Sequence, residues 1–374
     1  MQERAAAWLR ERSSTWRDWP ADQLLAAKRR GQHRISLVIP ARDEAGTVGT
    51  IVAGLDAALR REIPLLDELV VIDSDSIDDT ASVASAAGAT VHRARDILPS
   101  AGVRAGKGEA LWKSLFVTTG DILLFIDADL TRWGPHFATG LLGPLLAHAE
   151  VQLVRAAYAR LRTSGDGTVA ADGGRLTELV ARPLISMHWP ELAGVAQPLA
   201  GEWAIRRTLM ESLPIPYGYG VELSTLVDTV HRHGLAAVAQ VHLGVRGHRN
   251  RPDEELALAA AELLAVAESR RDRPPSRSDQ SPSSRSDQSP SSRSDQSPSS
   301  RNDQGLLWSG EGAAPTPVRE LHLWQFKADS EGWTPPTTKA VTTGERPPAR
   351  LFATPAGATP GAADGAATTP GAPR

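Results

Sequence analysis

The chain has 374 residues, of which 41% are hydrophobic, enough to form one large domain or two ordinary ones. A formal net charge of -3 without a long basic block argues against bulk nucleic acid as a partner, and the absence of cysteine restricts any metal to oxygen or imidazole ligands. No run of about 18 apolar residues is present and the N-terminus is too charged for a signal peptide, so we expect a cytoplasmic protein without a membrane span.

Strands and helices alternate through the first half of the chain. A polar arm bearing three tryptophans occupies residues 1–34, and beyond it short apolar runs predict strands, while stretches with acidic starts or glycine ends predict helices. The expected strands are 35–39, 68–73, 90–93 and 122–126, and the expected helices are 45–61, 78–88 and 108–119. This alternation is typical of βαβ units and a mainly parallel sheet.

The second half continues the pattern less regularly. We expect strands near 151–157 and 237–245 and helices at 174–188, 222–233 and 253–269. Residues 35–130 are therefore assigned to a Rossmann-like half, and 131–272 to the second half of the same domain.

Residues 273–374 are rich in Pro, Ser, Gly, Ala and Thr, a composition too poor in bulky apolar residues to offset the entropy of ordering the backbone. The octapeptide RSDQSPSS begins at Arg277, Arg285 and Arg293, and a partial copy begins at Arg301. These repeats carry no apolar residue that stacking would bury, so we predict a disordered tail. A short apolar island at 321–326 interrupts it, and whether this island docks on the domain is left open.

Acidic residues follow three of the predicted strands, within segments 40–44, 73–76 and 127–129. Ligands of parallel sheets bind at the carboxyl ends of the strands, so these segments are expected to converge on one crevice. Asp127 and Asp129 share one face of an extended segment, where one carboxylate can bind a hard divalent cation and the other can anchor the loop or a ribose hydroxyl. A carboxylate pair alone is a weak signal that gains weight from its position.

Two glycine-containing segments precede predicted helices and carry a cation. Lys107 lies between two glycines, and Gly174-Arg175 is followed by Thr177. Such segments suit anion binding at a helix N-terminus, although an ordinary loop-to-helix junction is the alternative for each. Two anion sites suggest two phosphorylated substrates. His248, at the end of the last strand, is a candidate neutral metal ligand or phosphate contact.

Several longer blocks are more specific than these short motifs. They are IPARDE at 39–44, VIDSDSIDDT at 71–80, AGKGEALWKSL at 105–115, FIDADL at 125–130, GGRLTELVARPL at 173–184, AGEWAIRR at 200–207, YGYGVE at 217–222 and LGVRGHRNR at 243–251. In this order, from Trp16 to Ser269, the chain resembles actinobacterial glucosyl-3-phosphoglycerate synthases. The resemblance implies an α/β glycosyltransferase of the A-type fold, with a Rossmann-like sheet flanked by helices. It also implies that residues 35–130 are the half that binds the nucleotide sugar and that 131–272 are the acceptor-binding half of the same catalytic domain.

The resemblance also implies the reaction and the roles of individual residues. Glucose would pass from UDP-glucose to the 2-hydroxyl of 3-phosphoglycerate with retention, in the presence of Mg2+ or alternatively Mn2+. Pro40, Ala41, Arg42, Glu44, Ser74 and Lys107 would bind the donor, with Asp127, Tyr219 and Glu222. Asp129 and His248 would hold the metal, and Gly174, Arg175, Thr177 and Asn250 would bind the acceptor. Glu222, Asp129 and Lys107 are the catalytic candidates, and Asp75 stands where glycine is more usual.

No closely paired carboxylates are obviously placed for a double displacement, so the working hypothesis is a front-face reaction in which the donor phosphate helps to deprotonate the acceptor. The alternatives are a related synthase that uses GDP-mannose or ADP-glucose or accepts glycerate, a polyprenyl-phosphate glycosyltransferase, a sugar-phosphate nucleotidyltransferase, and an inactive binding module. We also expect a homodimer, although the apolar helices of the second half suit a core as well as an interface.

Overall fold

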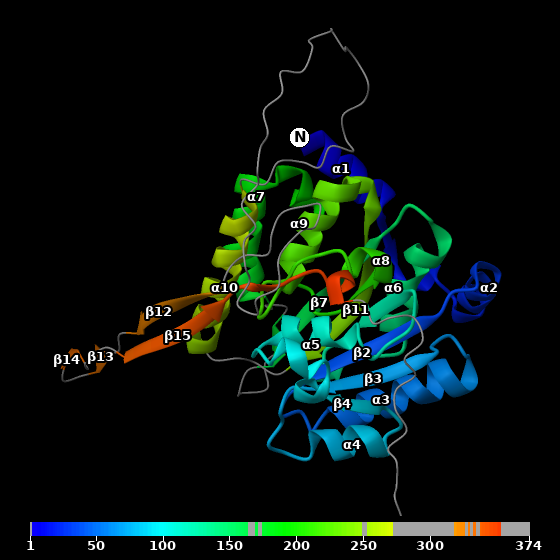
Figure 1. Ribbon diagram of the computed structural model, residues 1–374. Coiled ribbons are helices and arrows are strands. Elements are labelled where there is room, and N and C mark those ends of the chain that lie inside the picture. The colour runs from blue at the N-terminus through cyan, green and yellow to red at the C-terminus, as the bar shows by residue number, and fades with distance from the viewer. Residues whose placement is uncertain are drawn as a thin grey trace, which may run out of the picture.

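A computed structural model of the chain describes residues 2–163, 169–170, 174–248, 253–271, 318–325, 328–329, 332–333 and 337–352. Within this part, ten strands form one mixed sheet in the order β1-β11-β7-β9-β5-β2-β3-β4, with β6 paired to β11 and β8 to β7 (Figure 1). Their bounds are β1 Ser13–Thr15, β2 Ile35–Ala41, β3 Glu68–Asp73, β4 Thr90–Arg93, β5 Ile122–Phe125, β6 Leu130–Arg132, β7 Leu153–Thr163, β8 Val169–Ala170, β9 Trp203–Arg206 and β11 Val238–His248.

The half of the sheet that carries the acidic strand ends is parallel, as predicted. β2 pairs in parallel with both β5 and β3, and β3 pairs in parallel with β4. β9 was not predicted and runs antiparallel to both of its neighbours, β5 and β7. The carboxyl ends of β2, β3 and β5 therefore meet at one edge of the sheet.

Helices cover both faces because successive strand residues point to opposite sides. Leu37 and Ile39 belong to one core cluster, whereas Val38 between them belongs to the other. The first cluster packs under α2 Ala21–Gly31, α3 Val48–Asp56, α4 Thr80–Ala86 and α6 His136–Ala147. The second packs under α1 Gln2–Glu11, α5 Lys107–Ser114, α7 Arg182–His188, α9 Val221–His233 and α10 Asp253–Arg271. A short helix, α8 Arg207–Met210, follows β9.

The helix α6 escaped the sequence analysis because Gly140, Gly143 and Pro144 interrupt its pattern. The structure explains these glycines by close packing. An ideal Cβ at Gly143 would lie 2.2 Å from the Trp19 ring, and one at Gly140 would lie 2.7 Å from Leu243. The glycines let a helix that is buried on nearly all sides approach both the N-terminal segment and β11.

The N-terminal segment, expected as a polar arm, is part of the folded domain. β1 pairs in parallel with β11, and the Trp8 indole, which is 4% exposed, donates a hydrogen bond to the Val238 carbonyl at 2.8 Å. The tryptophans of this segment thus add apolar surface to the core. The many charged residues around them led to the expectation of a polar arm.

Part of the C-terminal segment also folds onto the domain, so the predicted boundary at residue 272 does not mark the end of the folded chain. β12 Arg319–Gln325 and β15 Thr337–Thr343 form a hairpin that projects beside α10, and β13 Ala328–Asp329 pairs with β14 Gly332–Trp333 (Figure 1). β16 Glu345–Arg346 then pairs with β10 Ile215–Pro216. The island at 321–326 thus lies mostly in a hairpin strand, and the repeats lie outside the described residues.

Along the described chain, no helix is both long enough and apolar enough to cross a membrane.

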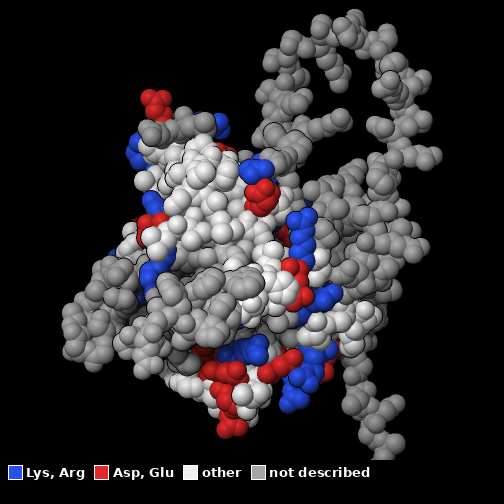
Figure 2. Space-filling model, turned by 90° about the vertical axis from the view of Figure 1, so that its left-hand side faces the viewer, with Lys and Arg blue, Asp and Glu red and all other residues white. Residues whose placement is uncertain are grey.

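On the face shown in Figure 2, acidic and basic side chains gather together in the lower part, beside a broad area without charge. The two signs are interspersed there.

The packing of the N-terminal segment predicts that substitutions at two neighbouring residues change the stability of the protein by different amounts. Replacing Trp8 by Ala removes a buried aromatic ring, so we expect the free energy of unfolding to fall by about 3 to 5 kcal/mol. Leu9→Ala is the control, because Leu9 is 44% exposed, and we expect a change within about 0.5 kcal/mol. Urea unfolding followed by tryptophan fluorescence measures both, and equal effects would contradict the integration of this segment into the core.

Candidate active site

One cavity of about 750 Å3 opens where β2, β3 and β5 end. Its volume is in the range of small-molecule sites. Every predicted site residue whose side chain the structure describes lines it: Pro40, Ala41, Arg42, Glu44, Ser74, Lys107, Asp127, Asp129, Gly174, Arg175, Thr177, Tyr219 and Glu222. The two halves of the domain thus contribute to a single space. The prediction for Asn250 lies outside the described residues, and of His248 only the backbone is described.

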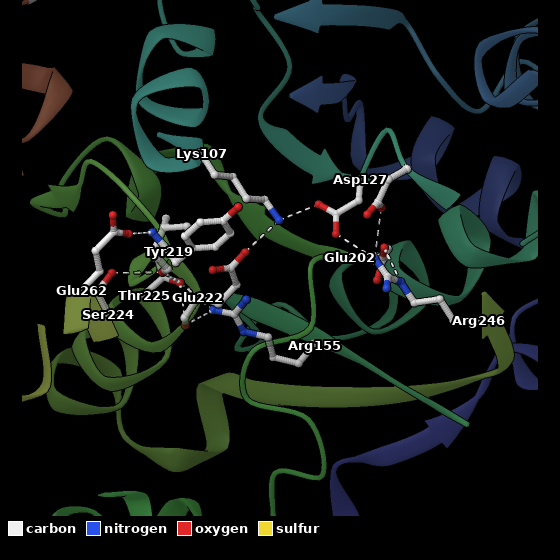
Figure 3. A network of polar contacts seen from close by, with 12 residues as sticks. Lys107, Asp127, Arg155, Glu202, Tyr219, Glu222, Ser224, Thr225, Arg246 and Glu262 are labelled. Atoms are coloured by element: carbon white, nitrogen blue, oxygen red, sulfur yellow. Dashed lines mark hydrogen bonds and ion pairs between the residues drawn. The ribbon is translucent and has the colours of Figure 1, made fainter. Parts of the chain in front are cut away.

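The Asp127 carboxylate is held by two cations. Its Oδ1 accepts from the Lys107 ammonium at 2.6 Å, and its Oδ2 accepts from the Arg246 guanidinium at 2.8 Å (Figure 3). The absence of a side chain at Gly201 leaves room for the Asp127 carboxylate, because an ideal Cβ at Gly201 would lie 1.9 Å from Asp127 Oδ2. Both oxygens are committed to the protein, which favours the supporting role predicted for Asp127.

Asp129 is placed differently. The Arg246 guanidinium is 3.7 Å from its Oδ1, and its side chain is 16% exposed and lines the cavity. The Thr47 hydroxyl donates to the Ala128 carbonyl at 2.6 Å, so the turn between the two aspartates is fixed to the start of α3. In the antiparallel pairing of β6 with β11, His248 lies opposite Leu130. The backbone therefore brings His248 next to the Asp129 loop.

Lys107 connects Asp127 to Glu222. Its ammonium is 2.8 Å from Glu222 Oε1, and the Glu222 side chain is 6% exposed (Figure 3). Burial alone would lower the pKa of Lys107, but the carboxylates of Asp127 and Glu222 outweigh that effect and raise the pKa above its ordinary value. Lys107 is thus a permanently charged ammonium, suited to stabilise negative charge in the cavity rather than to act as a base.

The two glycines that flank Lys107 have a structural role that the sequence analysis did not foresee. An ideal Cβ at Gly108 would lie 1.7 Å from the Pro216 carbonyl oxygen, and one at Gly106 would lie 2.4 Å from the Tyr217 carbonyl oxygen. The glycines therefore admit the backbone of the 215–218 segment. The anion-binding role of this loop stays a prediction, and it now depends on the Lys107 ammonium.

Sequence reasoning assigned no role to several charged residues of the site. Glu202 is fully buried and accepts from the Arg246 Nε at 2.9 Å, while its Oε2 has no hydrogen-bond partner among the described residues. Arg155 is also fully buried; its guanidinium donates to the Glu222 carbonyl, and burial lowers its pKa to about 10, so it remains charged at neutral pH. Both residues could have been found from their position in the sequence. Arg155 lies within an apolar strand and Glu202 directly before one, and a charged residue at such a place is expected to be buried and to need a partner.

The charges of the site fit a divalent cation. Around Asp127, the four carboxylates of Asp127, Asp129, Glu202 and Glu222 face three cations, Lys107, Arg246 and Arg155, so this cluster carries a formal charge of -1 before any phosphate enters. A diphosphate would add further negative charge. Carboxylate and imidazole ligands together with phosphate oxygens suit Mg2+ or Mn2+ without an all-protein cage. Among the described side chains no cluster of three metal-ligating groups is found.

The loop after β3 has an unusual backbone. Asp75 lines the cavity and adopts φ of 60°, a left-handed conformation that glycine adopts without strain. Its carboxylate pairs with the Arg95 guanidinium at 2.5 Å. The departure from glycine noted in the sequence is therefore accommodated by the turn, and it adds an acidic group with its own cation at this side of the cavity.

Comparisons with known proteins agree with this geometry. The model of glycosyl transferase family 2 matches residues 36–175. A glucosyl-3-phosphoglycerate synthase of Mycolicibacterium paratuberculosis is 46% identical over 272 residues, 72% of this chain and 81% of that protein. The synthase of Petrotoga mobilis is 42% identical over 251 residues, 67% of this chain and 77% of that protein.

Solved structures extend the similarity to three dimensions. A Mycobacterium tuberculosis glucosyl-3-phosphoglycerate synthase in complex with Mn2+, UDP-glucose and phosphoglyceric acid has a TM-score of 0.70 and 37% identity, covering 92% of this chain and 99% of that one. The same enzyme in complex with Mg2+ and UDP has a TM-score of 0.69 and 38% identity, covering 90% and 96%.

The sheet, the carboxylates at its strand ends and these matches define a glycosyltransferase of the A-type fold. The predicted fold class is thereby confirmed. Within that class, the chain belongs to the glucosyl-3-phosphoglycerate synthase family.

Glu262 of α10 gives the cavity a titratable wall. Its Oε2 accepts from the Tyr219 backbone N–H at 2.6 Å, and burial raises its pKa to about 7. The folded state thus holds this proton more tightly than the unfolded chain, and the free energy of unfolding should fall as pH rises from the ordinary value of 4.5 to about 7.

We expect Glu262→Gln to remove this part of the pH dependence and to make the protein more stable at pH 8, because the amide keeps an acceptor for Tyr219 without a charge. The exposed Glu255 of the same helix is the control, and Glu255→Gln should leave the curve unchanged. Melting temperatures between pH 5 and pH 8 measure the effect. A wild-type slope retained by Glu262→Gln would contradict the assignment.

Proposed function

We propose that this chain transfers glucose from UDP-glucose to the 2-hydroxyl of 3-phosphoglycerate, with release of UDP and formation of glucosyl-3-phosphoglycerate. The observation that carries the proposal is the single cavity that joins the predicted donor residues to the loop of Gly174, Arg175 and Thr177. The names of the family members and the UDP-glucose and phosphoglyceric acid in a related structure support it.

In this proposal, Pro40, Ala41, Arg42, Glu44 and Ser74 form the nucleoside side of the cavity. The Lys107 ammonium lies next to the diphosphate, and Tyr219 and Glu222 face the sugar. Arg175 and Thr177 bind the acceptor, with Asn250. Asp129 and His248 hold Mg2+ or Mn2+, which neutralises charge on the UDP leaving group.

The proposed stereochemical course is retention through a front-face reaction. The bond between the anomeric carbon and the phosphate oxygen breaks, the acceptor oxygen bonds to the same face, and the proton of the 2-hydroxyl passes to the donor phosphate. Glu222 is a poor covalent nucleophile here because its carboxylate is 2.8 Å from the Lys107 ammonium and its side chain is only 6% exposed. Lys107 and Arg246 provide fixed positive charge beside the breaking bond.

Two further proposals concern the state of the protein. We propose a homodimer, which light scattering of the purified chain tests directly. We also propose a cytoplasmic location, where nucleotide sugars and phosphorylated three-carbon acids are available.

The first functional prediction concerns activity and its dependence on Asp129. Purified protein incubated with UDP-glucose, 3-phosphoglycerate and Mg2+ should release UDP and form a product of the mass of glucosyl-3-phosphoglycerate. Asp129→Ala should lose this activity, because the substitution removes a metal ligand. The exposed Asp79 is the control, and Asp79→Ala should retain full activity. An inactive wild type contradicts the proposal, pyrophosphate release indicates a nucleotidyltransferase, and faster transfer from GDP-mannose or ADP-glucose indicates a related synthase.

The second functional prediction concerns Glu222. Glu222→Gln keeps the shape of the side chain but removes one anion from Lys107, so we expect transfer to slow by less than about a thousandfold. Glu268→Gln, in an exposed position on α10, serves as the control. Initial rates and intact-protein mass spectrometry measure the outcome. A loss far beyond this limit, with a glycosyl adduct trapped on another side chain, contradicts the front-face course.

A further inference from the structure

A C-terminal segment far from the catalytic motifs in sequence is buried beside the site. Residues 344–349 are all buried. β16 pairs with β10, the Tyr217 N–H donates to the Gly344 carbonyl at 3.2 Å, and the Trp112 indole donates to the Pro347 carbonyl at 2.9 Å. Residues 272–317, which include the octapeptide repeats, connect α10 to this part of the chain. The segment therefore returns to the domain after a long excursion in sequence.

Arg346 is the most extensively bonded residue of the segment. Its side chain is 2% exposed, and it forms two parallel bonds with Glu109, from Nε to Oε2 at 2.6 Å and from Nη2 to Oε1 at 2.7 Å. The same guanidinium donates to the Ala101 carbonyl at 2.6 Å and to the Gly102 carbonyl at 3.2 Å. The rigid, planar guanidinium thus donates four hydrogen bonds, two to one carboxylate and two to the backbone of one loop, a geometry that lysine cannot reproduce.

These contacts hold the segment that carries Lys107. Glu109 lies two residues after Lys107 in α5, and Ala101 and Gly102 begin the loop that leads to it. The Glu109 N–H donates to the Tyr217 carbonyl at 2.9 Å, and its Oε1 accepts from the Arg104 N–H at 3.3 Å. Arg346 therefore fixes the chain on both sides of the lysine that pairs with Asp127 and Glu222.

The neighbouring residue fixes another wall of the cavity. The Glu345 carboxylate is 2.5 Å from the Arg270 guanidinium of α10, which also pairs with Asp228 of α9 at 2.9 Å. All three side chains are at most 5% exposed. Helix α10 contributes Glu262 to the cavity, so Glu345 and Arg346 together tie α10, β10 and the Lys107 loop to one short strand.

We propose that Arg346 is a positioning residue for Lys107, and that the C-terminal segment is in this way a component of the donor site. Arg346 lines no part of the cavity described above and acts through Glu109 and the 101–106 loop. The inference rests on the proposed function, because it assigns Lys107 to the donor diphosphate.

The test uses the full-length chain with substitutions of different severity. Arg346→Lys keeps the charge and loses the two parallel bonds, and we expect kcat/KM for UDP-glucose to fall about tenfold. Arg346→Gln also loses the charge, and we expect a fall of about a hundredfold, the size of effect that a small misplacement of a catalytic group produces. The affinity for UDP in the presence of Mg2+ should fall with both.

Two controls separate positioning from loss of stability. Arg350→Gln changes an exposed arginine of the same segment and should leave the kinetics unchanged. Lys28→Met breaks a mostly buried ion pair with Asp67, of 2.7 Å, on α2; it should lower the melting temperature without lowering kcat/KM.

The decisive measurement is a double-mutant cycle with Lys107→Met, read as the affinity for UDP. If Arg346 acts through Lys107, Arg346→Lys should weaken UDP binding in the wild-type background and have little further effect in the Lys107→Met background. Additive effects would overturn the inference, and so would a folded Arg346→Lys protein with wild-type kinetics. If Arg346→Gln fails to fold, the lysine variant still decides. A wild type without transferase activity contradicts the proposed function, whereas an active wild type with an equally active Arg346→Lys contradicts this inference alone.

Discussion

The Asp127 carboxylate, held between the Lys107 ammonium and the Arg246 guanidinium, is the contact on which the site depends. It begins a series of alternating charges that runs from Glu222 through Lys107, Asp127 and Arg246 to Glu202. Charges this deeply buried are stable only when each one is paired, and removing one member leaves its neighbour uncompensated. The series crosses from the end of β5 to α9 and β11, so the same interaction that balances charge also fixes the two halves of the domain around one cavity.

This arrangement separates the roles of two similar side chains. Asp127 is occupied by protein cations on both oxygens, whereas Asp129 is 3.7 Å from its cation and borders the cavity. The difference arises from the surroundings rather than from the residues themselves. A lone pair of aspartates in a sequence does not show which of the two is paired with protein cations; in the structure the lysine and the arginine both bond to Asp127.

Much of the fold followed from local patterns in the sequence, whereas most of the candidate site residues were implied by the resemblance to a known family. Apolar runs that end in acidic residues located β2, β3 and β5, and the parallel sheet then required their ends to meet. The Lys107 loop was recognised from its glycines, but the close approach of Pro216 and Tyr217 that explains them depends on tertiary packing. Helix α6 was missed because its glycines serve packing against other elements. Arg346 was missed because its partner Glu109 is 237 residues away in the chain, and no local pattern reports such a pair.

The reversed strand β9 has a topological consequence for the site. Because β9 runs antiparallel to β5, the residues just before it, and not those after it, lie at the catalytic edge of the sheet. Gly201 and Glu202 enter the site in this way, one as a space for the Asp127 carboxylate and the other as a partner of Arg246. If β9 were parallel to β5, the residues at this edge would instead belong to the loop that leaves the carboxyl end of the strand. Because Glu202 directly precedes the first paired residue of β9, the sheet itself holds the backbone of the carboxylate that pairs with Arg246, and this backbone cannot move independently of the sheet.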